Sequence, residues 1–194
     1  MRYQKLISEL SKYGEITENE RKNIRDFFSI INVKKRDILI CKDSPCNKLF
    51  FVNKGLLRTF YIDINGNEIT RRIAWENGFL TNMNSFRKNG IDNNETIECL
   101  ENAELLVITK SDIDYLLKSS ENLTRIYNII LEKYMAINIR RYEHVTSLNP
   151  TERLNYFNNN FPNIKNRISD TILATYLSIS RKTLERIKKN LINK

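Results

Sequence analysis

The feature that most constrains the fold of this chain is the stretch from residue 121 to residue 148, which contains neither proline nor glycine. Such a stretch favours one long helix, because proline and glycine interrupt helices more strongly than other residues. Its apolar residues follow two faces. One face comprises Ile126, Ile130, Tyr134 and Ile137, and the other comprises Leu131, Met135, Ala136, Ile139 and Tyr142. A helix that is apolar on two faces must be covered on two faces.

Two interpretations of this helix remain open. Its own chain covers both faces, or one face packs on its own chain and the other on the identical helix of a second copy. We expect the second arrangement, a twofold homodimer. The residues that we assign to the dimer helix are Ile126, Ile130, Tyr134 and Ile137.

Residues 30–109 consist of short runs that are typical of β-strands and are separated by turn residues. The runs are residues 37–40, 48–52, 56–62, 68–74, 79–82, 96–100 and 104–109. Regular short strands favour an antiparallel barrel or jelly roll. Asn65-Gly66 predicts a hairpin in which both residues have positive φ, and Gly55 indicates another tight turn. With helices on both sides of this region, the predicted fold class is α+β.

Helix-start signals lie on both sides of the β region. Thr17 and Glu20 have the spacing of a capping box, in which each side chain satisfies a backbone N–H of the other residue. Ser111 begins a second candidate. Asn149 is a good cap, and Pro150 follows at the first helical position, where its missing N–H has no cost. Helices are therefore predicted to begin close to each of these residues.

Residues 169–189 predict two short helices separated by Ser178, Ile179 and Ser180. Ser169 and Ser180 stand where each helix needs a cap. The small or apolar residues available where the helices cross are Leu173, Ala174, Leu177, Ile179, Leu184 and Ile187. This pattern is typical of a helix-turn-helix, whose second helix enters the major groove of DNA. Serine occupies position 178, where glycine is the commonest residue of the turn.

Positive charge is concentrated in the second of these helices. Residues 181–194 carry six basic residues against Glu185 alone, which gives +5 of the chain's net charge of +9. A helix that is merely solvated would carry both signs, so we favour DNA as the partner. The residues expected at base edges are Arg181, Lys182 and Arg186. The residues expected at phosphates are Ser169, Ser180, Thr183, Lys188 and Lys189.

The composition argues against several other classes of protein. No apolar run is long enough to span a bilayer, and the N-terminal segment contains Glu9, so we expect no membrane span, no signal peptide and a cytoplasmic location. Cys41, Cys46 and Cys99 suit free thiols better than disulfides, and His144 is the single histidine, so no metal site is expected. No P-loop, paired-histidine motif or serine elbow is present. We therefore expect no catalytic residues, no cofactor and no enzymatic activity.

The layout resembles that of the Crp/Fnr-type transcription regulators over essentially the whole chain. The resemblance rests on KLFFVNKGLLRTF, residues 48–60, and ATYLSISRKTLERI, residues 174–187. It implies a cyclic-nucleotide-binding-like jelly roll over residues 1–119, a dimerisation helix over 120–148 and a winged-type helix-turn-helix domain over 149–194. It also implies base contacts by Arg181 and Arg186. Lys182 stands where many members have glutamate, which implies a different preferred DNA sequence.

The same resemblance implies where an effector would bind. In cAMP-binding members a Gly-Glu-Leu-Gly stretch holds the ribose, and an Arg-Ser/Thr pair holds the cyclic phosphate. The residues at the corresponding places are Asn82, Ser85, Arg87, Asn94 and Glu95. Asn82 replaces the glutamate, and Arg87 lies nearby and could substitute for the missing arginine. A phosphate without the paired arginine loses its strongest hydrogen bonds, so we do not expect cAMP. An iron–sulfur cluster is also disfavoured, because it needs four cysteine ligands and the chain has three.

The favoured function is that of a homodimeric, sequence-specific DNA-binding transcription regulator on an inverted-repeat operator. Its expected partners are double-stranded DNA and a second copy, with a small effector and RNA polymerase as further candidates. The alternative is a ligand-sensing or protein-interaction module with a non-specific basic tail. Sequence preference in DNA binding at physiological salt distinguishes the two.

Overall fold

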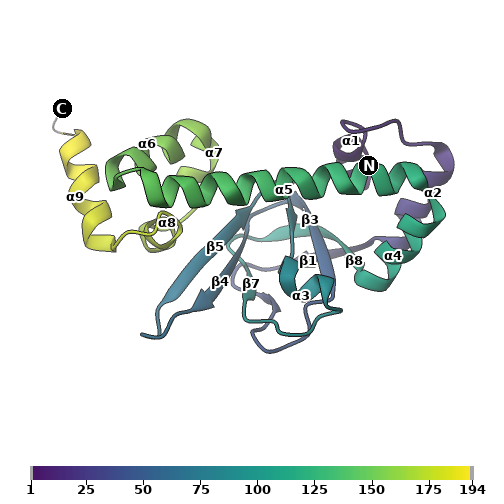
Figure 1. Cartoon of the computed structure of the whole chain (residues 1–194), viewed down its shortest axis with the longest axis horizontal. Helices are drawn as coiled ribbons and strands as arrows, with labels where there is room; N and C mark the ends of the chain where they lie inside the picture. The colour runs from purple at the N-terminus through teal and green to yellow at the C-terminus, as the bar shows by residue number, and fades with distance from the viewer. Residues whose placement is uncertain (1, 193–194) are drawn as a thin grey trace.

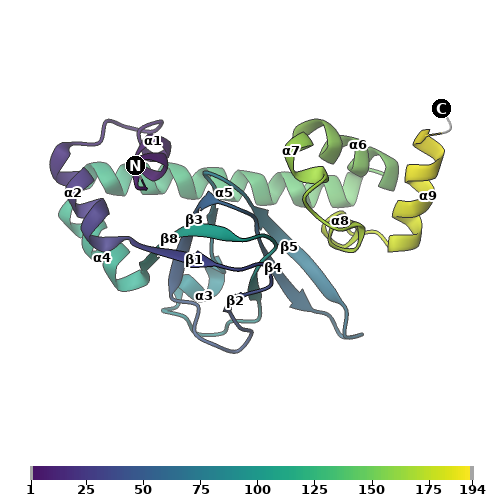
Figure 2. The ribbon, with the colours of Figure 1, turned by 180° about the vertical axis from the view of Figure 1, so that it is seen from behind.

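The computed structural model describes residues 2–192 and places helix α5 (Glu121–Ser147) along the long axis of the molecule (Figure 1). Two β-sheets lie on one side of α5. Helices α1, α2 and α4 gather at one end of it, and α6, α7, α8 and α9 gather at the other (Figures 1 and 2). Within residues 2–192, no helix combines the length and the apolar character that crossing a bilayer requires.

The remaining elements have the following bounds. The helices are α1 (Gln4–Leu10), α2 (Glu18–Phe27), α3 (Met83–Arg87), α4 (Lys110–Ser119), α6 (Pro150–Asn160), α7 (Pro162–Lys165), α8 (Asp170–Tyr176) and α9 (Arg181–Ile192). The strands are β1 (Ser29–Val33), β2 (Ile38–Ile40), β3 (Lys48–Lys54), β4 (Leu57–Ile62), β5 (Glu68–Ala74), β6 (Phe79–Leu80), β7 (Thr96–Cys99) and β8 (Ala103–Thr109).

The strands form two four-stranded sheets with the orders β1-β8-β3-β6 and β2-β7-β4-β5. Every strand pair is antiparallel. These orders are those of a jelly roll, so the predicted α+β fold with an antiparallel jelly roll is confirmed. Strand β1 was not among the predicted runs. It pairs along its whole length with β8, with Ser29 opposite Val107 and Val33 opposite Ala103.

The turn between β4 and β5 differs from the prediction. Gly66 has φ of 81°, but Asn65 is not in the positive-φ region, so the expectation for both central residues is wrong. The Asp63 carboxylate accepts hydrogen bonds from the N–H groups of Asn65 at 2.8 Å and Asn67 at 2.9 Å. An aspartate that bonds to the backbone ahead of it forms its own turn, and this lengthens the loop beyond two residues.

The first predicted capping box is present. The Thr17 hydroxyl accepts from the N–H of Glu20 at 3.3 Å, and the Glu20 carboxylate accepts from the N–H of Thr17 at 2.8 Å. Glu20 is buried, and its other oxygen accepts from the Ser120 hydroxyl at 2.6 Å. The cap of α2 therefore also fixes the beginning of α5.

Two further helix starts were predicted on the sides of the β region, at Asn149 and at Ser111, and the one at Asn149 is correct. Asn149 caps α6, and Glu152 returns the second bond of a capping box to the Asn149 N–H at 2.8 Å. Helix α4 begins earlier than predicted. Its cap is Thr109 at the end of β8, which accepts from the Asp112 N–H at 3.2 Å, and Ser111 lies inside the helix. The strand thus continues directly into the helix.

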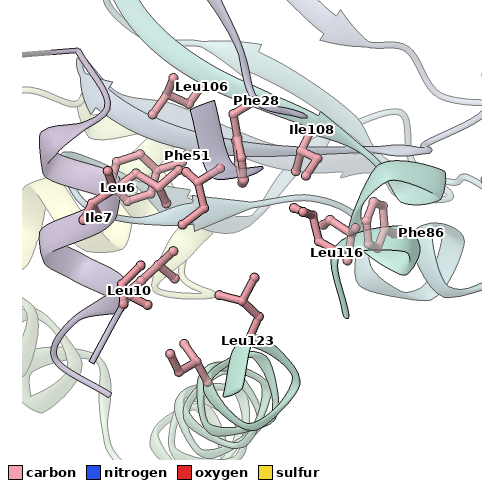
Figure 3. Packing of buried hydrophobic residues seen from close by; sticks show 14 residues of the cluster. Leu6, Ile7, Leu10, Phe28, Phe51, Phe86, Leu106, Ile108, Leu116 and Leu123 are labelled. Atoms are coloured by element: carbon pink, nitrogen blue, oxygen red, sulfur yellow. The ribbon is translucent and has the colours of Figure 1, made fainter. Parts of the chain in front are cut away.

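The first half of α5 packs inside its own protomer (Figure 3). Ile126 is buried with Leu6 and Phe51 in a cluster that joins α1 to the first sheet, and Ile130 packs at the edge of that cluster. The Arg72 guanidinium lies over the ring of Tyr134, 4.0 Å from the ring centroid. Ile126 is therefore not available for the dimer contact to which it was assigned, because its own protomer buries it, and Ile130 and Tyr134 are partly covered in the same way.

The second half of α5 leaves apolar side chains exposed. Met135 is 60% exposed, Ile139 57% and Tyr142 70%. Their spacing of four and three residues places them in one stripe on the helix. Ile137, the fourth residue assigned to the dimer contact, is also exposed, but it points to a different side of the helix. Met135, Ile139 and Tyr142 thus form one exposed apolar stripe on the second half of α5.

The C-terminal helices share a core with the jelly roll. Leu56 and Leu100, from two loops of the jelly roll, are buried with Leu154, Phe157 and Leu184. Ion pairs of Arg167, which lies just before α8, add a second connection between the loops of the jelly roll and the C-terminal helices. The Arg167 guanidinium donates to Glu76 at 2.9 and 3.0 Å and to Glu101 at 2.6 and 2.9 Å.

This ion pair predicts an acid-sensitive contribution to stability. Burial alone would raise the pKa of Glu76, but hydrogen bonds from Arg167 and from the Gly55 N–H lower it from 4.5 to about 2. The contribution is fully present above pH 4.5 and is lost as pH falls toward 2. We expect Glu76→Gln to reduce the free energy of unfolding by about 1–3 kcal/mol at neutral pH and by progressively less at lower pH, in urea titrations at each pH. A deficit that does not change with pH would contradict this account.

Candidate nucleic-acid interface

Helices α8 and α9 form the predicted helix-turn-helix, each with a serine cap. The Ile172 N–H donates to the Ser169 hydroxyl at 3.3 Å at the start of α8. The Thr183 N–H donates to the Ser180 hydroxyl at 3.0 Å at the start of α9. These bonds satisfy N–H groups that have no partner inside the helix. Both serines therefore use their hydroxyl oxygens within the motif.

The turn between the helices places a non-glycine residue in the left-handed region. Ser178 has φ of 55°, and the adjoining Ile179 N–H donates to the Ala174 carbonyl at 3.0 Å. Ala174 is almost completely buried beneath this turn, where a larger side chain would separate the helices. Leu184 and Ile187 are buried on the inner face of α9. The inner face of α9 is thus fixed, and its opposite face is left to solvent.

The outward face of α9 presents basic side chains. Lys182, Arg186 and Lys189 are exposed, and none of them forms an ion pair with a carboxylate among residues 2–192. Arg181 is also exposed but contacts Glu185, with Nε 3.0 Å from the carboxylate oxygen. An exposed pair four residues apart contributes only about 0.3–0.5 kcal/mol, so a stronger anion can displace Glu185. The face therefore has several cations available to an external anion.

Some residues expected at phosphates have partners inside the motif. Lys188 forms an ion pair with Asp170 at the start of α8, which joins the two helices. The hydroxyls of Ser180 and Thr183 lie 2.8 Å apart and are hydrogen-bonded to each other. Lys189 remains exposed. Lys194, counted in the charge of this segment, lies outside the described residues.

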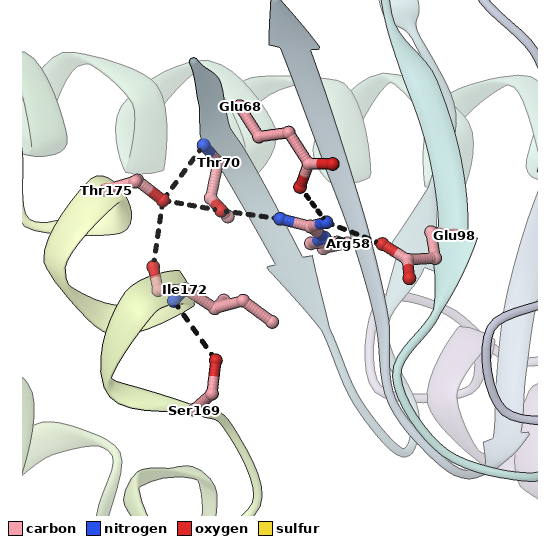
Figure 4. Close-up of polar contacts among 7 residues, drawn as sticks. All are labelled: Arg58, Glu68, Thr70, Glu98, Ser169, Ile172 and Thr175. Carbon is pink, nitrogen blue, oxygen red and sulfur yellow. Dashed lines mark hydrogen bonds and ion pairs between the residues drawn. The ribbon is translucent and has the colours of Figure 1, made fainter.

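Helix α8 rests directly on the jelly roll through a polar contact that the sequence did not indicate (Figure 4). The Thr175 hydroxyl donates to the Thr70 hydroxyl at 2.9 Å, and the Thr70 N–H donates to Thr175 at 3.3 Å. Behind Thr70 lies the buried guanidinium of Arg58, which pairs with Glu68 and, at 2.7 Å, with Glu98. Two carboxylates compensate this buried charge. Strand β5 therefore provides a polar docking point for the helix-turn-helix.

Arg141 joins three parts of the chain. This residue lies on α5 and donates to the carbonyls of Thr70 at 3.1 Å and Arg71 on β5, and to the carbonyl of Tyr176 at 3.0 Å at the end of α8. The β-hairpin expected of a winged motif has no counterpart in residues 149–192, which form only helices and their connections. The neighbour of α8 is instead the jelly roll itself.

The predicted effector residues occupy different environments. Asn82 caps α3, and its side chain also donates to Asn93 at 2.9 Å. Ser85 is buried, while Arg87 and Asn94 are exposed. Glu95 is buried, which raises the pKa of its carboxyl, and it lies 3.3 Å from Arg71 of β5. Asn82 and the Glu95 N–H both donate to the Asn93 side-chain oxygen, whereas Arg87 and Asn94 lie on the surface.

A cavity of about 100 Å³ lies beside α3, between the jelly roll and the first half of α5. Its walls are almost entirely apolar and include Phe79, Phe86 and Tyr127. Sites for drug-sized ligands have volumes of about 300–1,000 Å³. This cavity is too small and too apolar for a nucleotide in the described structure.

Comparisons with known proteins agree with this architecture. Residues 30–120 match the family of the cyclic nucleotide-binding domain. The chain is similar in structure to a protein from Eubacterium rectale that is assigned to the Crp/Fnr family of transcriptional regulators. The identity is 20%, the similarity covers 90% of this chain and 82% of that one, and the TM-score is 0.71. A comparison with curated protein sequences gives no match.

Two further solved structures show the same arrangement. The c-di-GMP responsive global regulator CLP of Xanthomonas campestris has 15% identity and a TM-score of 0.74, with 91% of this chain and 92% of that chain covered. FixK2 of Bradyrhizobium japonicum has 11% identity and a TM-score of 0.70, with 86% and 85% covered. At these identities the similarity shows the fold.

Proposed function

We propose that this chain, which has the fold of the Crp/Fnr-type regulators and matches the cyclic nucleotide-binding domain over residues 30–120, is a DNA-binding transcription regulator. The observation that carries the proposal is the outward face of α9, where Lys182, Arg186 and Lys189 are exposed and unpaired among residues 2–192. A recognition helix needs such a face, because DNA presents phosphates and guanine acceptors to it.

The proposed roles of the basic residues on α9 follow from their positions along the helix. Arg181 lies at the N-terminal end, where recognition helices commonly contact base edges. Arg186 lies one turn and a half further along and offers a second guanidinium for two hydrogen bonds to guanine. Lys182 is a third candidate at bases, and Lys189 is better suited to a phosphate. Lys188 forms an ion pair with Asp170 of α8, so its proposed role is to fix α9 against α8.

The proposed functional unit is a homodimer joined through α5. Met135, Ile139 and Tyr142 form an exposed apolar stripe that water would otherwise contact. Packing two such stripes about a twofold axis buries both and places one α9 on each side of the axis. Two recognition helices related in this way fit an inverted repeat with half-sites about one helical turn apart.

The proposed regulator does not use cAMP as its effector. Asn82 stands in place of the ribose-binding glutamate and is engaged as a helix cap. Arg87 is exposed, and the buried carboxylate of Glu95 would repel a phosphate. The apolar cavity beside α3 does not provide the missing donors.

Single alanine substitutions test the assignment of α9. We expect Arg186→Ala and Arg181→Ala each to weaken binding to the preferred duplex by about 1–3 kcal/mol, with little change on a random duplex. Lys189→Ala should weaken both duplexes equally and reduce the slope of affinity against salt by about one. Fluorescence anisotropy with both duplexes at several salt concentrations measures these quantities. Equal losses on both duplexes for Arg186→Ala and Arg181→Ala would assign those residues to phosphates.

A further inference from the structure

Arg153 of α6 holds together two connections of the chain that are distant in sequence. Its Nε donates to the Leu148 carbonyl at 3.0 Å, at the end of α5. Its Nη1 donates to the carbonyls of Leu177 at 3.1 Å and Ser178 at 3.3 Å, in the turn between α8 and α9. One guanidinium therefore joins the end of the long helix to the turn of the helix-turn-helix.

The turn between α8 and α9 receives hydrogen bonds from outside as well as from within. Inside the turn, the Ile179 N–H donates to the Ala174 carbonyl at 3.0 Å and satisfies one of the last carbonyls of α8. The carbonyls of Leu177 and Ser178 accept from Arg153. Ser178 has φ of 55°, a conformation that glycine adopts more easily than serine. Arg153 thus stabilises a turn that the serine itself disfavours.

A guanidinium suits this role because it is planar and its donors keep a fixed arrangement. If the turn moved relative to the end of α5, at least one of the hydrogen bonds of Arg153 would break. A lysine ammonium on a flexible stem does not impose this relation. Helix α9 begins at Arg181, shortly after Ser178, so its direction follows from the position of the turn.

Other contacts hold α8, whereas Arg153 holds the turn that leads to α9. Arg141 donates to the Tyr176 carbonyl at 3.0 Å, and the Thr175 hydroxyl donates to Thr70 at 2.9 Å. Arg153 itself is only half-buried and does not belong to the apolar core that α6, α8 and α9 share. Loss of its hydrogen bonds should therefore leave the fold in place and loosen the position of α9.

We propose that Arg153 is a positioning residue that sets the spacing between the two half-sites of the operator. This inference rests on the proposed function, in which α5 carries the dimer contact and α9 reads the bases. In such a dimer, a residue that fixes α9 relative to the end of α5 also fixes the separation of the two recognition helices. Arg153 acts through Leu148 and the turn and contacts no base.

The experiment measures binding of the full-length protein to inverted repeats that differ only in half-site spacing, by fluorescence anisotropy. The natural chain should prefer one spacing to those longer or shorter by a base pair or two. Arg153→Gln should bind the preferred spacing about tenfold more weakly, the scale of a lost hydrogen bond from a charged donor, and should lose most of the discrimination between spacings. Its sequence preference within each half-site should be unchanged, because Arg181 and Arg186 remain.

Two further variants separate positioning from charge. Arg153→Lys keeps the positive charge but not the planar set of donors, so it should discriminate between spacings as poorly as Arg153→Gln. It also keeps the test informative if Arg153→Gln fails to fold. Arg25→Gln removes an exposed arginine on α2, at the opposite end of α5 (Figure 1), and should bind as the natural chain does.

Two results would overturn the proposal. In the first, Arg153→Gln and Arg153→Lys keep the spacing preference of the natural chain. In the second, Arg153→Gln weakens binding by the same factor at every spacing, which would assign Arg153 to the stability of the motif or, with a smaller salt slope, to a phosphate. Failure of the proposed function looks different, because the natural chain itself would then prefer no half-site sequence or no spacing, and this inference would fall with it.

Discussion

The Ile139→Glu variant should sediment as a monomer at concentrations where the natural chain sediments as a dimer. Ile139 is 57% exposed in the protomer and lies in the middle of the stripe with Met135 and Tyr142. In the proposed dimer this side chain is buried, so two glutamates would face each other without cations. An uncompensated buried charge costs about 3–5 kcal/mol, which corresponds to a dimer dissociation constant raised by about 100-fold or more. Affinity for a duplex with two half-sites should fall as the dimer dissociates.

The matched control is Ile64→Glu at the tip of the β4–β5 hairpin. Ile64 is fully exposed, so this variant makes the same change of charge far from α5. It should remain dimeric by sedimentation velocity and bind the duplex as the natural chain does. If Ile139→Glu and Ile64→Glu sediment alike, the stripe on α5 is not the dimer contact.

The Leu184→Ala variant should lose about 2–5 kcal/mol of unfolding free energy, because it removes a fully buried side chain from the core shared by α6, α8 and α9. That core also includes Leu56 and Leu100 of the jelly roll, so the loss should appear in the main unfolding transition. Binding to specific and random duplexes should fall together, because the loss affects the position of α9 and not one contact. Chemical denaturation and anisotropy measure the two effects.

Leu191→Ala provides the comparison within the same helix. Leu191 is 41% exposed, and its truncation should change the unfolding free energy by no more than about 0.5 kcal/mol. If Leu184→Ala and Leu191→Ala are equally destabilising, α9 does not pack through the face that contains Leu184.

Local chemistry made much of the fold predictable from the sequence. The caps at Thr17 and Asn149 act within three residues, so their side chains alone define where α2 and α6 begin. The same holds for Ser169 and Ser180, and the separation of buried and basic faces on α9 follows from helical periodicity. These features depend on neighbouring residues and not on the tertiary structure.

Other features depend on contacts between distant residues. Strand β1 is stabilised by pairing with β8, and its short sequence gave no strong signal of its own. Ile126 and Met135 are both apolar residues of α5, and only the position of α1 and the sheet decides that Ile126 is buried and Met135 is not. The contact of Thr175 with Thr70 joins residues 105 positions apart, and two threonines carry no pattern that would indicate it.

The candidate sites divide in the same way. The basic face of α9 was predictable because one helix supplies all of it. The contacts of Arg141 were not, because they join α5 to β5 and α8, and an arginine alone resembles an ordinary surface residue. The effector residues implied by resemblance were aligned by position, but Asn82 and Glu95 serve the local structure in this chain.

Selection of binding sites from a pool of random duplexes, with the full-length protein at physiological salt, tests the central claim most directly. We expect enrichment of an inverted repeat with half-site centres about ten base pairs apart or a multiple of that spacing. The enrichment should be absent for the Arg181→Ala/Arg186→Ala double variant. No enriched motif, or the same motif enriched by the double variant, would contradict the claim that α9 reads DNA sequence in a homodimer.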